Sequence, residues 1–277
     1  MTREQERAKA RRRHQKLEAR AAERARIAAR NRQVGIVVAA VLVVVLGLVF
    51  LTSALNSHST PAVAASSAPA SGAKPSPSAS TGPTTLEGCA TPPPRPTTIK
   101  TSKLPDKRTA AGKHFTAVVT TNCGRITLAL DGAKAPQTVA SFLALARSGY
   151  FAASPCHRLT TAGIFVLQCG DPLGGRGTGP GYSYGIENAP KDGKYPTGTL
   201  AMARTSDPHS NGDQFFIVYK DSTLPTDGGG YSIFGTVTGG MDIVDRIAAA
   251  GASGGTGDGA PNAPISILSV AVTEKKA

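Results

Sequence analysis

The feature that most constrains this chain is an uninterrupted apolar run, Val34–Leu51, which contains no polar side chain. Extended through Leu55 it reaches 22 residues, which as a helix would span about 33 Å and match the hydrocarbon core of a bilayer. We therefore expect one transmembrane helix over residues 34–55. A cleaved signal peptide, with a formal site at Ala62–Ala64, is the alternative. It is disfavoured because the run exceeds a usual signal core of about 7–15 residues and ends well before that site.

Basic residues are concentrated before the apolar run. Residues 1–33 hold 12 of the 31 Lys and Arg residues but only 4 of the 18 Asp and Glu residues, so most of the net charge of +13 belongs to this segment. Its composition, rich in Ala, Arg, Glu and Lys without Gly or Pro, favours a helix. No Lys or Arg occurs between Arg32 and Lys74, so the positive-inside rule places residues 1–33 in the cytoplasm and the chain after residue 55 outside. We expect a single-pass cell-membrane protein whose basic segment meets anionic lipid, with no nucleic acid as partner.

A low-complexity stretch follows the apolar run. Between residues 56 and 85, only Asn56, His58, Val63 and Lys74 are not Ala, Ser, Pro, Thr or Gly. Such a segment cannot bury enough apolar surface to fold, and the Pro-rich run TPPPRPTT prolongs it. We expect a disordered linker over residues 56–112.

The pattern changes at about Lys113. Two β-rich runs, at 114–121 and 124–130, flank an Asn-Cys-Gly turn signal and predict a hairpin. Apolar spacing over 136–148 and 241–250 predicts two amphipathic helices, each followed by Gly. Short apolar strands divided by Gly-rich loops make up the rest, at 156–160, 163–168, 198–203, 214–219, 231–237 and 264–272. Many short strands with only two helices predict a mainly β domain over residues 113–277, a closed antiparallel β-barrel capped by two α-helices.

The stretch from Cys156 to Asp171 contains Cys and His residues that invite three interpretations. A zinc site is disfavoured because no C-x-x-C or H-x-x-x-H spacing supplies four ligands, so we expect no metal and no cofactor. A Cys/His catalytic pair is disfavoured because Cys156 and His157, as neighbours on a strand, point to opposite faces. Disulfides are favoured because an even number of cysteines lies after the apolar run, at Cys89, Cys123, Cys156 and Cys169.

The pairing of these cysteines stays open, since four cysteines allow three connectivities. If Arg158 and Gln168 share one face of two regularly paired strands, Cys156 shares it and Cys169 faces away. A regular pairing of those two strands would then not join Cys156 to Cys169.

Five motifs in a fixed order carry a resemblance to a known family: HR with IFVLQCGDP, then GRGTGPGY, GTLAMART, NGDQFFI and FGTVTGGMDIVD. Over roughly residues 113–275 the chain resembles the cyclophilin family of peptidyl-prolyl cis-trans isomerases, and its motifs resemble those of membrane-tethered actinobacterial members. The resemblance implies a cyclophilin-like barrel and an enzyme that rotates X-Pro peptide bonds and assists the folding of exported proteins. The implied partners are Pro-containing unfolded or extended polypeptides, and we expect a monomer. The alternative is a binding module of the same fold that grips such segments without turnover.

The resemblance also implies roles for individual residues. Arg158 would place a cation near the prolyl nitrogen, Gln168 would orient Arg158, and Phe165 would complete this catalytic group. The proline pocket would be formed by Phe165, Val166, Phe216 and Leu224, with Tyr231 beside it. The extended peptide would be held by the main chain of Ala203 and Arg204, by Gln214, and by Gly177 and Thr178 at the neighbouring subsite.

Several departures from the family pattern bear on these roles. Two extra residues, within TTAG, separate Arg158 from Gln168 compared with the best-known eukaryotic members. Where those members carry Trp and His, this chain has Thr223 or Leu224 and then Tyr231. Because cyclosporin binding in the family relies partly on that Trp, we expect weak cyclosporin affinity.

Overall fold

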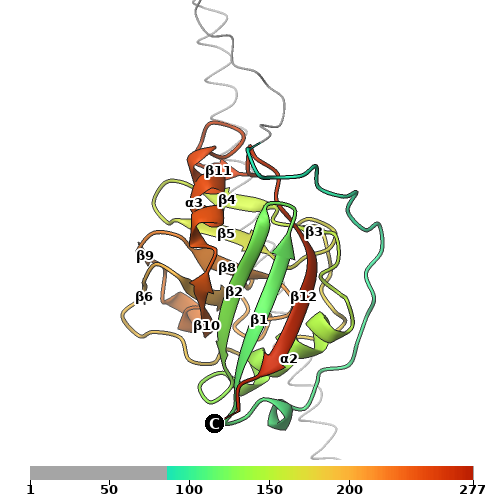
Figure 1. The fold of residues 1–277 in the computed structure, drawn as a ribbon. Helices are drawn as coiled ribbons and strands as arrows, with labels where there is room; N and C mark the ends of the chain where they lie inside the picture. Colours follow the sequence, from blue (N-terminus) through green and yellow to red (C-terminus); the bar gives the residue numbers. More distant parts are fainter. Residues whose placement is uncertain (1–85, 277) are drawn as a thin grey trace, which may run out of the picture. The chain divides into compact units, whose positions relative to one another are not determined.

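The computed structural model describes residues 86–276, drawn in colour in Figure 1. The predicted basic segment 1–33, the predicted transmembrane helix 34–55 and the first part of the predicted linker, 56–85, lie outside the described residues. Within residues 86–276, no helix combines the length and the apolar character needed to cross a membrane.

The described residues form short strands and two α-helices, and every strand longer than two residues overlaps a segment predicted as strand. The strands are β1 (His114–Thr121), β2 (Gly124–Asp131), β3 (Ser154–Pro155), β4 (Arg158–Thr160), β5 (Val166–Cys169), β6 (Lys194–Tyr195), β7 (Thr199–Met202), β8 (Phe215–Val218), β9 (Ser222–Thr223), β10 (Ile233–Gly239), β11 (Asp258–Gly259) and β12 (Ser266–Glu274). The helices are α2 (Pro136–Arg147) and α3 (Met241–Ala249), with 3₁₀ turns η1 (Lys107–Thr109) and η2 (Asp227–Gly229).

Ten of these strands form one antiparallel sheet in the order β11-β4-β5-β8-β7-β10-β2-β1-β12-β3. The sheet curls into a half-barrel, so the prediction of a closed barrel is wrong. Its two edge strands, β11 and β3, are two residues long, and Pro155 in β3 has no N–H to donate to a further strand. The chain passes from β3 to β4 through Cys156 and His157, where strand structure is interrupted. The two edge strands do not pair with each other, so the sheet stays open.

The central strands β5, β7 and β8 are apolar at nearly every position because both of their faces are covered. Along β8, Phe215 and Ile217 belong to the main core inside the curl, whereas Phe216 and Val218 belong to a second apolar cluster on the outer face. This second cluster consists of Val166, Tyr195, Ala201, Phe216, Val218 and Leu224. A sheet buried on both faces reads as continuous apolar runs rather than as an alternating pattern. The outer cluster becomes the floor of the candidate site.

The two α-helices lie at opposite ends of the curled sheet (Figure 1) and insert apolar faces into the main core. Pro136 occupies the first turn of α2, where a missing N–H costs nothing. Gly240 precedes α3 with a φ of 82°, and a Cβ there would meet the carbonyl oxygen of Arg125 at 2.4 Å. Both helix predictions are confirmed. Glycine is required at position 240, where the chain passes from the sheet into α3.

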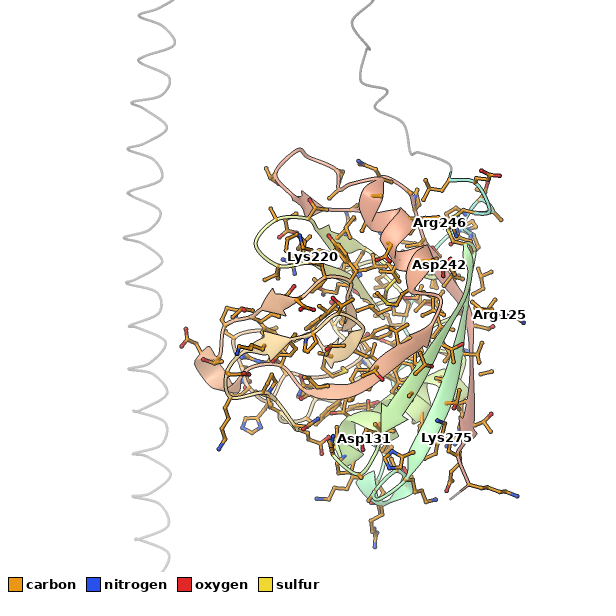
Figure 2. All side chains as sticks on the ribbon, turned by 60° about the vertical axis from the view of Figure 1, so that its left-hand side comes forward. Arg125, Asp131, Lys220, Asp242, Arg246 and Lys275 are labelled. Carbon is orange, nitrogen blue, oxygen red and sulfur yellow. A yellow bond between two sulfur atoms is a disulfide. The ribbon has the colours of Figure 1, made fainter. Side chains whose placement is uncertain are left out.

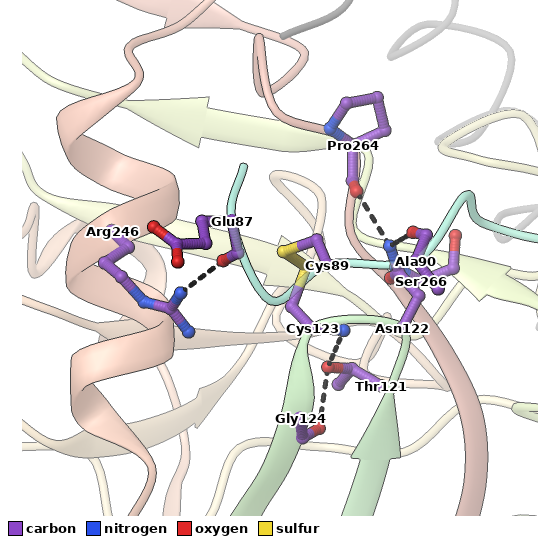
Figure 3. Close-up of a disulfide and its surroundings, with 10 residues drawn as sticks. All are labelled: Glu87, Cys89, Ala90, Thr121, Asn122, Cys123, Gly124, Arg246, Pro264 and Ser266. Carbon is purple, nitrogen blue, oxygen red and sulfur yellow. Dashed lines mark hydrogen bonds between the residues drawn. A yellow bond between two sulfur atoms is a disulfide. The ribbon is translucent and has the colours of Figure 1, made fainter. Parts of the chain in front are cut away.

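An extended segment, residues 86–105, runs along the outside of the domain before η1, drawn in teal in Figure 1. We call it the strap. A disulfide between Cys89 and Cys123 joins it to the β1–β2 turn (Figure 3). Asn122 reinforces this junction, since its side chain donates to the carbonyl oxygens of Ala90 and Pro264.

Further along, the strap contacts the loop between β5 and β6. The N–H of Ser102 donates to the carbonyl of Pro180 at 2.7 Å, and Arg95 donates to the carbonyl of Leu173 at 3.3 Å. Leu86 and Ile99 pack against the main core. The second part of the predicted linker, residues 86–112, therefore has defined structure, because a disulfide and partly buried apolar anchors compensate for its Pro-rich composition.

Candidate active site

Arg158 and Gln168 lie directly opposite each other on the paired strands β4 and β5. Arg158 Nη1 donates to Gln168 Oε1 at 3.3 Å, and Gln168 Nε2 donates to Gln214 Oε1 at 2.8 Å. The two extra residues lie in the turn between the strands, where Ala162 and Ile164 form an isolated bridge. The insertion is thus absorbed by the turn and does not separate the two side chains.

A second disulfide, between Cys156 and Cys169, brackets this pair. Cys156 lies two residues before Arg158, and Cys169 directly follows Gln168. Because the strand is interrupted at Cys156–His157, the alternation of β4 does not extend to Cys156, whose side chain is buried in the core beside Cys169. All four cysteines are in disulfides, so none is free to bind a metal or to act as a nucleophile.

A hollow of about 350 Å³ opens beside Arg158 and Gln168. Its apolar walls come from Ile164, Val166, Phe216, Leu224 and Tyr231, and its polar rim from His157, Arg158, Gln168, Arg204 and Gln214. Val166, Phe216 and Leu224 are at most 5% exposed, so the apolar floor is held firmly by the outer cluster. These walls are suited to a proline ring, and Leu224, not Thr223, lines the hollow.

Phe165 does not line this hollow, contrary to its expected place in the proline pocket. It lies between Ile164 and Val166 and points to the other side of the strand, since neighbouring side chains alternate. Its ring packs edge-on against Tyr219 at 5.9 Å, with Lys220 Nζ 4.7 Å from the ring centroid. Ile164 takes the place that the resemblance gave to Phe165.

Tyr231 is held over the hollow by two residues whose side chains the sequence did not single out for this purpose. Tyr195 Oη accepts from the N–H of Tyr231 at 2.8 Å and donates to its carbonyl at 3.0 Å. The guanidinium carbon of Arg204 lies 4.9 Å from the centroid of the Tyr231 ring. Arg204 also donates to the carbonyls of Gly230 and Asp227. The side chain of Arg204, and not only its main chain, therefore fixes the loop that carries Tyr231.

A second hollow of about 420 Å³ adjoins the first and shares Gln168, Ala203, Arg204 and Gln214 with it. Its other walls include the remaining predicted subsite residues, Gly177 and Thr178. Gly177 has no room for a side chain, because a Cβ would lie 2.4 Å from Asp171 Oδ1 and 2.7 Å from Ile99 of the strap. The predicted peptide-binding residues thus form one groove with two compartments, and the strap supports the far wall.

A larger hollow, about 700 Å³, lies elsewhere, around the start of β1 and the end of β12. Asp131 and Lys275, labelled in Figure 2, are among its lining residues. It contains none of the predicted site residues. The convergence of Arg158, Gln168 and the apolar cluster identifies the smaller hollow as the candidate site.

Two buried side chains, Tyr150 and Asp213, form a hydrogen-bonded pair beside the second compartment. Tyr150 Oη donates to Asp213 Oδ2 at 2.5 Å, and both residues are about 5% exposed. Burial raises the pKa of Asp213 to about 6, although the hydrogen bond from Tyr150 opposes this shift. Burial likewise lowers the pKa of His157, which favours its neutral form at the rim of the proline pocket.

The raised pKa of Asp213 predicts a pH-dependent contribution to stability. Because the folded state holds this proton more tightly than the unfolded chain, with a pKa of about 6 against 3.8, the contribution is complete below about pH 4 and is lost as the pH rises through about 6. The free energy of unfolding of the wild type relative to Asp213→Asn should fall by about 2 kcal/mol between pH 4 and pH 7. Urea unfolding of the full chain, without reductant, measures this difference.

Asp192→Asn, which removes an exposed carboxylate, supplies the substitution control for this measurement and should change the free energy of unfolding by no more than about 0.5 kcal/mol. A wild-type advantage over Asp213→Asn that stays constant or grows with pH would contradict the assignment.

Asp258, in β11, is a site residue that sequence reasoning missed. Its two carboxylate oxygens accept from Arg158 Nε at 2.8 Å and Nη2 at 2.7 Å. This hydrogen-bonded pair raises the pKa of Arg158 and lowers that of the Asp258 carboxyl. The two residues are 100 positions apart in the sequence. No local pattern could have signalled the contact.

Comparisons with known proteins agree with the fold. Residues 116–272 match the model of the family described as cyclophilin type peptidyl-prolyl cis-trans isomerase/CLD. The chain is 42% identical over 197 residues to a probable peptidyl-prolyl cis-trans isomerase B of Mycobacterium tuberculosis, covering 66% of this chain and 63% of the relative. It therefore spans less than two thirds of that relative's length.

Two further matches cover nearly the whole of the other protein. Peptidyl-prolyl cis-trans isomerase B of Escherichia coli is 38% identical over 168 residues, which are 56% of this chain and 97% of the relative. The crystal structure of a cyclophilin type peptidyl-prolyl cis-trans isomerase of Cryptosporidium parvum superposes with a TM-score of 0.50 at 29% identity, covering 59% of this chain and 99% of that one. Since the family model spans more than half of the 277 residues, this chain belongs to the cyclophilin-type peptidyl-prolyl cis-trans isomerase family.

Proposed function

We propose that this chain catalyses cis–trans isomerisation of X-Pro peptide bonds in unfolded or extended polypeptides. The observation that carries the proposal is the position of Arg158, which is hydrogen-bonded to Gln168 at the rim of an apolar hollow walled by Val166, Phe216 and Leu224. The hollow suits a proline ring, and the adjoining compartment suits the residues that precede it.

The chemistry of the reaction requires no nucleophile, metal or general base. Rotation about an X-Pro bond breaks amide resonance but neither makes nor cuts a covalent bond, and without catalysis it takes tens of seconds. In the twisted amide the prolyl nitrogen regains a lone pair, which the Arg158 guanidinium would stabilise. An acceleration of 10⁵-fold requires lowering the barrier by about 7 kcal/mol. The apolar walls would hold the ring while the acyl side of the bond turns.

A refolding experiment tests this activity on a protein substrate. A protein whose refolding ends in a slow, proline-limited phase should complete that phase faster when a small molar fraction of the full chain is present. Its fast phases should keep their rates. An unchanged slow phase, even at equimolar chain, would contradict the proposal.

We further propose that the domain works outside the cytoplasmic membrane, on exported proteins, and is held there by residues 34–55. Two observations support this location: the 22-residue apolar segment in the sequence and the use of all four cysteines in disulfides, which persist in oxidising compartments. We also propose that residues 1–33 contact anionic lipid and that the protein has no nucleic acid partner.

Lysine labelling tests the location and the orientation together. A membrane-impermeant amine reagent added to intact cells should modify the exposed Lys220 and Lys275 of the domain. Lys9 and Lys16, before the apolar run, should react only after the membrane is permeabilised. Labelling of Lys9 but not of Lys220 in intact cells would overturn the proposed orientation.

A further inference from the structure

The guanidinium of Arg158 is shared between two partners on its two sides. Its Nε and Nη2 donate to both oxygens of Asp258, at 2.8 Å and 2.7 Å, while Nη1 donates to Gln168. A bidentate contact with a carboxylate fixes the plane of a guanidinium as well as its position. The Asp258 carboxylate does not line the proline pocket. It therefore orients the Arg158 guanidinium, which faces the pocket, from outside.

The backbone around Asp258 is built for close approach to β4. Asp258 pairs with Thr160 and Gly259 with Leu159, and the N–H of Thr161 donates to the carbonyl of Gly257 at 2.7 Å. Asp258 stands between two glycines that have no room for a side chain. A Cβ on Gly257 would lie 2.9 Å from Ala162, and one on Gly259 would lie 2.2 Å from the carbonyl oxygen of Ser253.

Stability alone does not explain this arrangement. The side chains of Arg158 and Asp258 are 40% and 51% exposed, and exposed ion pairs contribute little to folding because solvent screens them. What the contact does change is the freedom of the Arg158 side chain, which would otherwise sample many rotamers at the mouth of the pocket. A small misplacement of a catalytic group costs rate even where the fold is unaffected.

We propose that Asp258 is a positioning residue for Arg158, holding the guanidinium in the orientation that faces the prolyl nitrogen. This inference rests on the proposed isomerase function. Asp258 acts through Arg158 and does not touch the substrate. Asp258 lies in β11, which follows α3 in the chain, within the Gly-rich stretch Gly254–Gly259. Its side-chain partner, Arg158, is 100 positions away in the sequence.

Kinetics of Asp258→Asn in the full chain test the proposal against a matched control. With an X-Pro peptide, Asp258→Asn should lower kcat by about 3- to 10-fold and leave KM nearly unchanged. Asp106→Asn removes a carboxylate that accepts from the Nε and Nη2 of another arginine, Arg108, on a remote surface, and it should leave both constants unchanged.

Two further readouts separate positioning from a general effect on the fold. In an Arg158→Ala background, Asp258→Asn should change kcat no further, because its effect passes through the missing guanidinium. The Nε–Hε NMR resonance of Arg158, assigned from its loss in Arg158→Ala, should be distinct in the wild type and should move to the position of free arginine side chains in Asp258→Asn.

The outcomes distinguish this inference from the function on which it rests. An active wild type with an equally active Asp258→Asn would overturn positioning and leave the isomerase intact. An equal loss in both backgrounds would also overturn positioning, since Asp258 would then act independently of Arg158. A wild type that does not accelerate X-Pro rotation would overturn the proposed function and this inference together.

Discussion

Replacing Arg158 by alanine should lower kcat/KM for an X-Pro peptide by about 100- to 1,000-fold, the usual loss when one preorganised charge is removed from a transition state. Two arginines line the hollow, and the side chain of Arg204 is engaged by the carbonyls of Gly230 and Asp227, so Arg158 is the cation assigned to the prolyl nitrogen. Its loss should leave the free energy of unfolding within about 1 kcal/mol of the wild type, because its ion pair is exposed.

Two variants sharpen this prediction. Arg158→Lys keeps the charge but cannot reproduce the fork that contacts Asp258 and Gln168 together, so its activity should fall between those of the wild type and Arg158→Ala. Arg108→Ala removes an exposed arginine that also pairs with a carboxylate, and it should be fully active. Full activity in Arg158→Ala would contradict the mechanism.

Removing the disulfide between Cys89 and Cys123 should destabilise the domain more than any single surface change. The bridge closes a loop with a sequence separation of 34, and chain-entropy arguments assign such a loop about 4 kcal/mol. A variant with both residues replaced by serine should therefore lose about that much free energy of unfolding, measured by urea unfolding without reductant. Intact mass should confirm that the Cys156–Cys169 bridge remains.

The same variant should also weaken peptide binding, because the strap supports the second compartment through Ile99, which packs near Gly177, and through the bond from Ser102 to Pro180. KM should rise for peptides that extend before the proline and change little for shorter ones. An unfolding free energy within about 1 kcal/mol of the wild type would show that the strap is held without its bridge.

The sequence predicted the elements that follow from local patterns. The hairpin of β1 and β2 is marked by an Asn-Cys-Gly turn, and both helices are marked by apolar spacing with Pro or Gly at their ends. The resemblance implied that Gln168 orients Arg158. The structure places the two residues opposite each other with a hydrogen bond between their side chains, because the extra residues fall in a turn.

What the sequence did not reveal depends on contacts between distant segments. Phe165 was expected beside Val166 in the pocket, although alternation places neighbouring side chains on opposite sides. The strap looked like a linker because its composition is Pro-rich, but its bridge to Cys123 and its contacts through Ile99 and Ser102 make it part of the domain. The sheet stays open because its two end strands, β3 and β11, do not pair with each other, and no periodicity in the sequence indicates this.

The pairing of Cys156 with Cys169 shows the limit of arguments from strand periodicity. Regular strands would keep these two side chains on opposite faces, yet both are buried in the core. The chain breaks its strand geometry at Cys156–His157, where the N–H of Cys156 donates to Ile265 instead of continuing the β4 ladder. Alternation predicts facing only within an unbroken strand.

The most direct test of the central claim is exchange NMR spectroscopy on an unmodified X-Pro peptide with a small molar fraction of the full chain. Without enzyme the cis and trans resonances exchange over tens of seconds. The wild type should bring this exchange into the range of seconds or faster, and Arg158→Ala should leave it near the uncatalysed rate. A wild type that shifts the peptide resonances, and so binds, but leaves the exchange rate unchanged would contradict the account and identify a binding module instead.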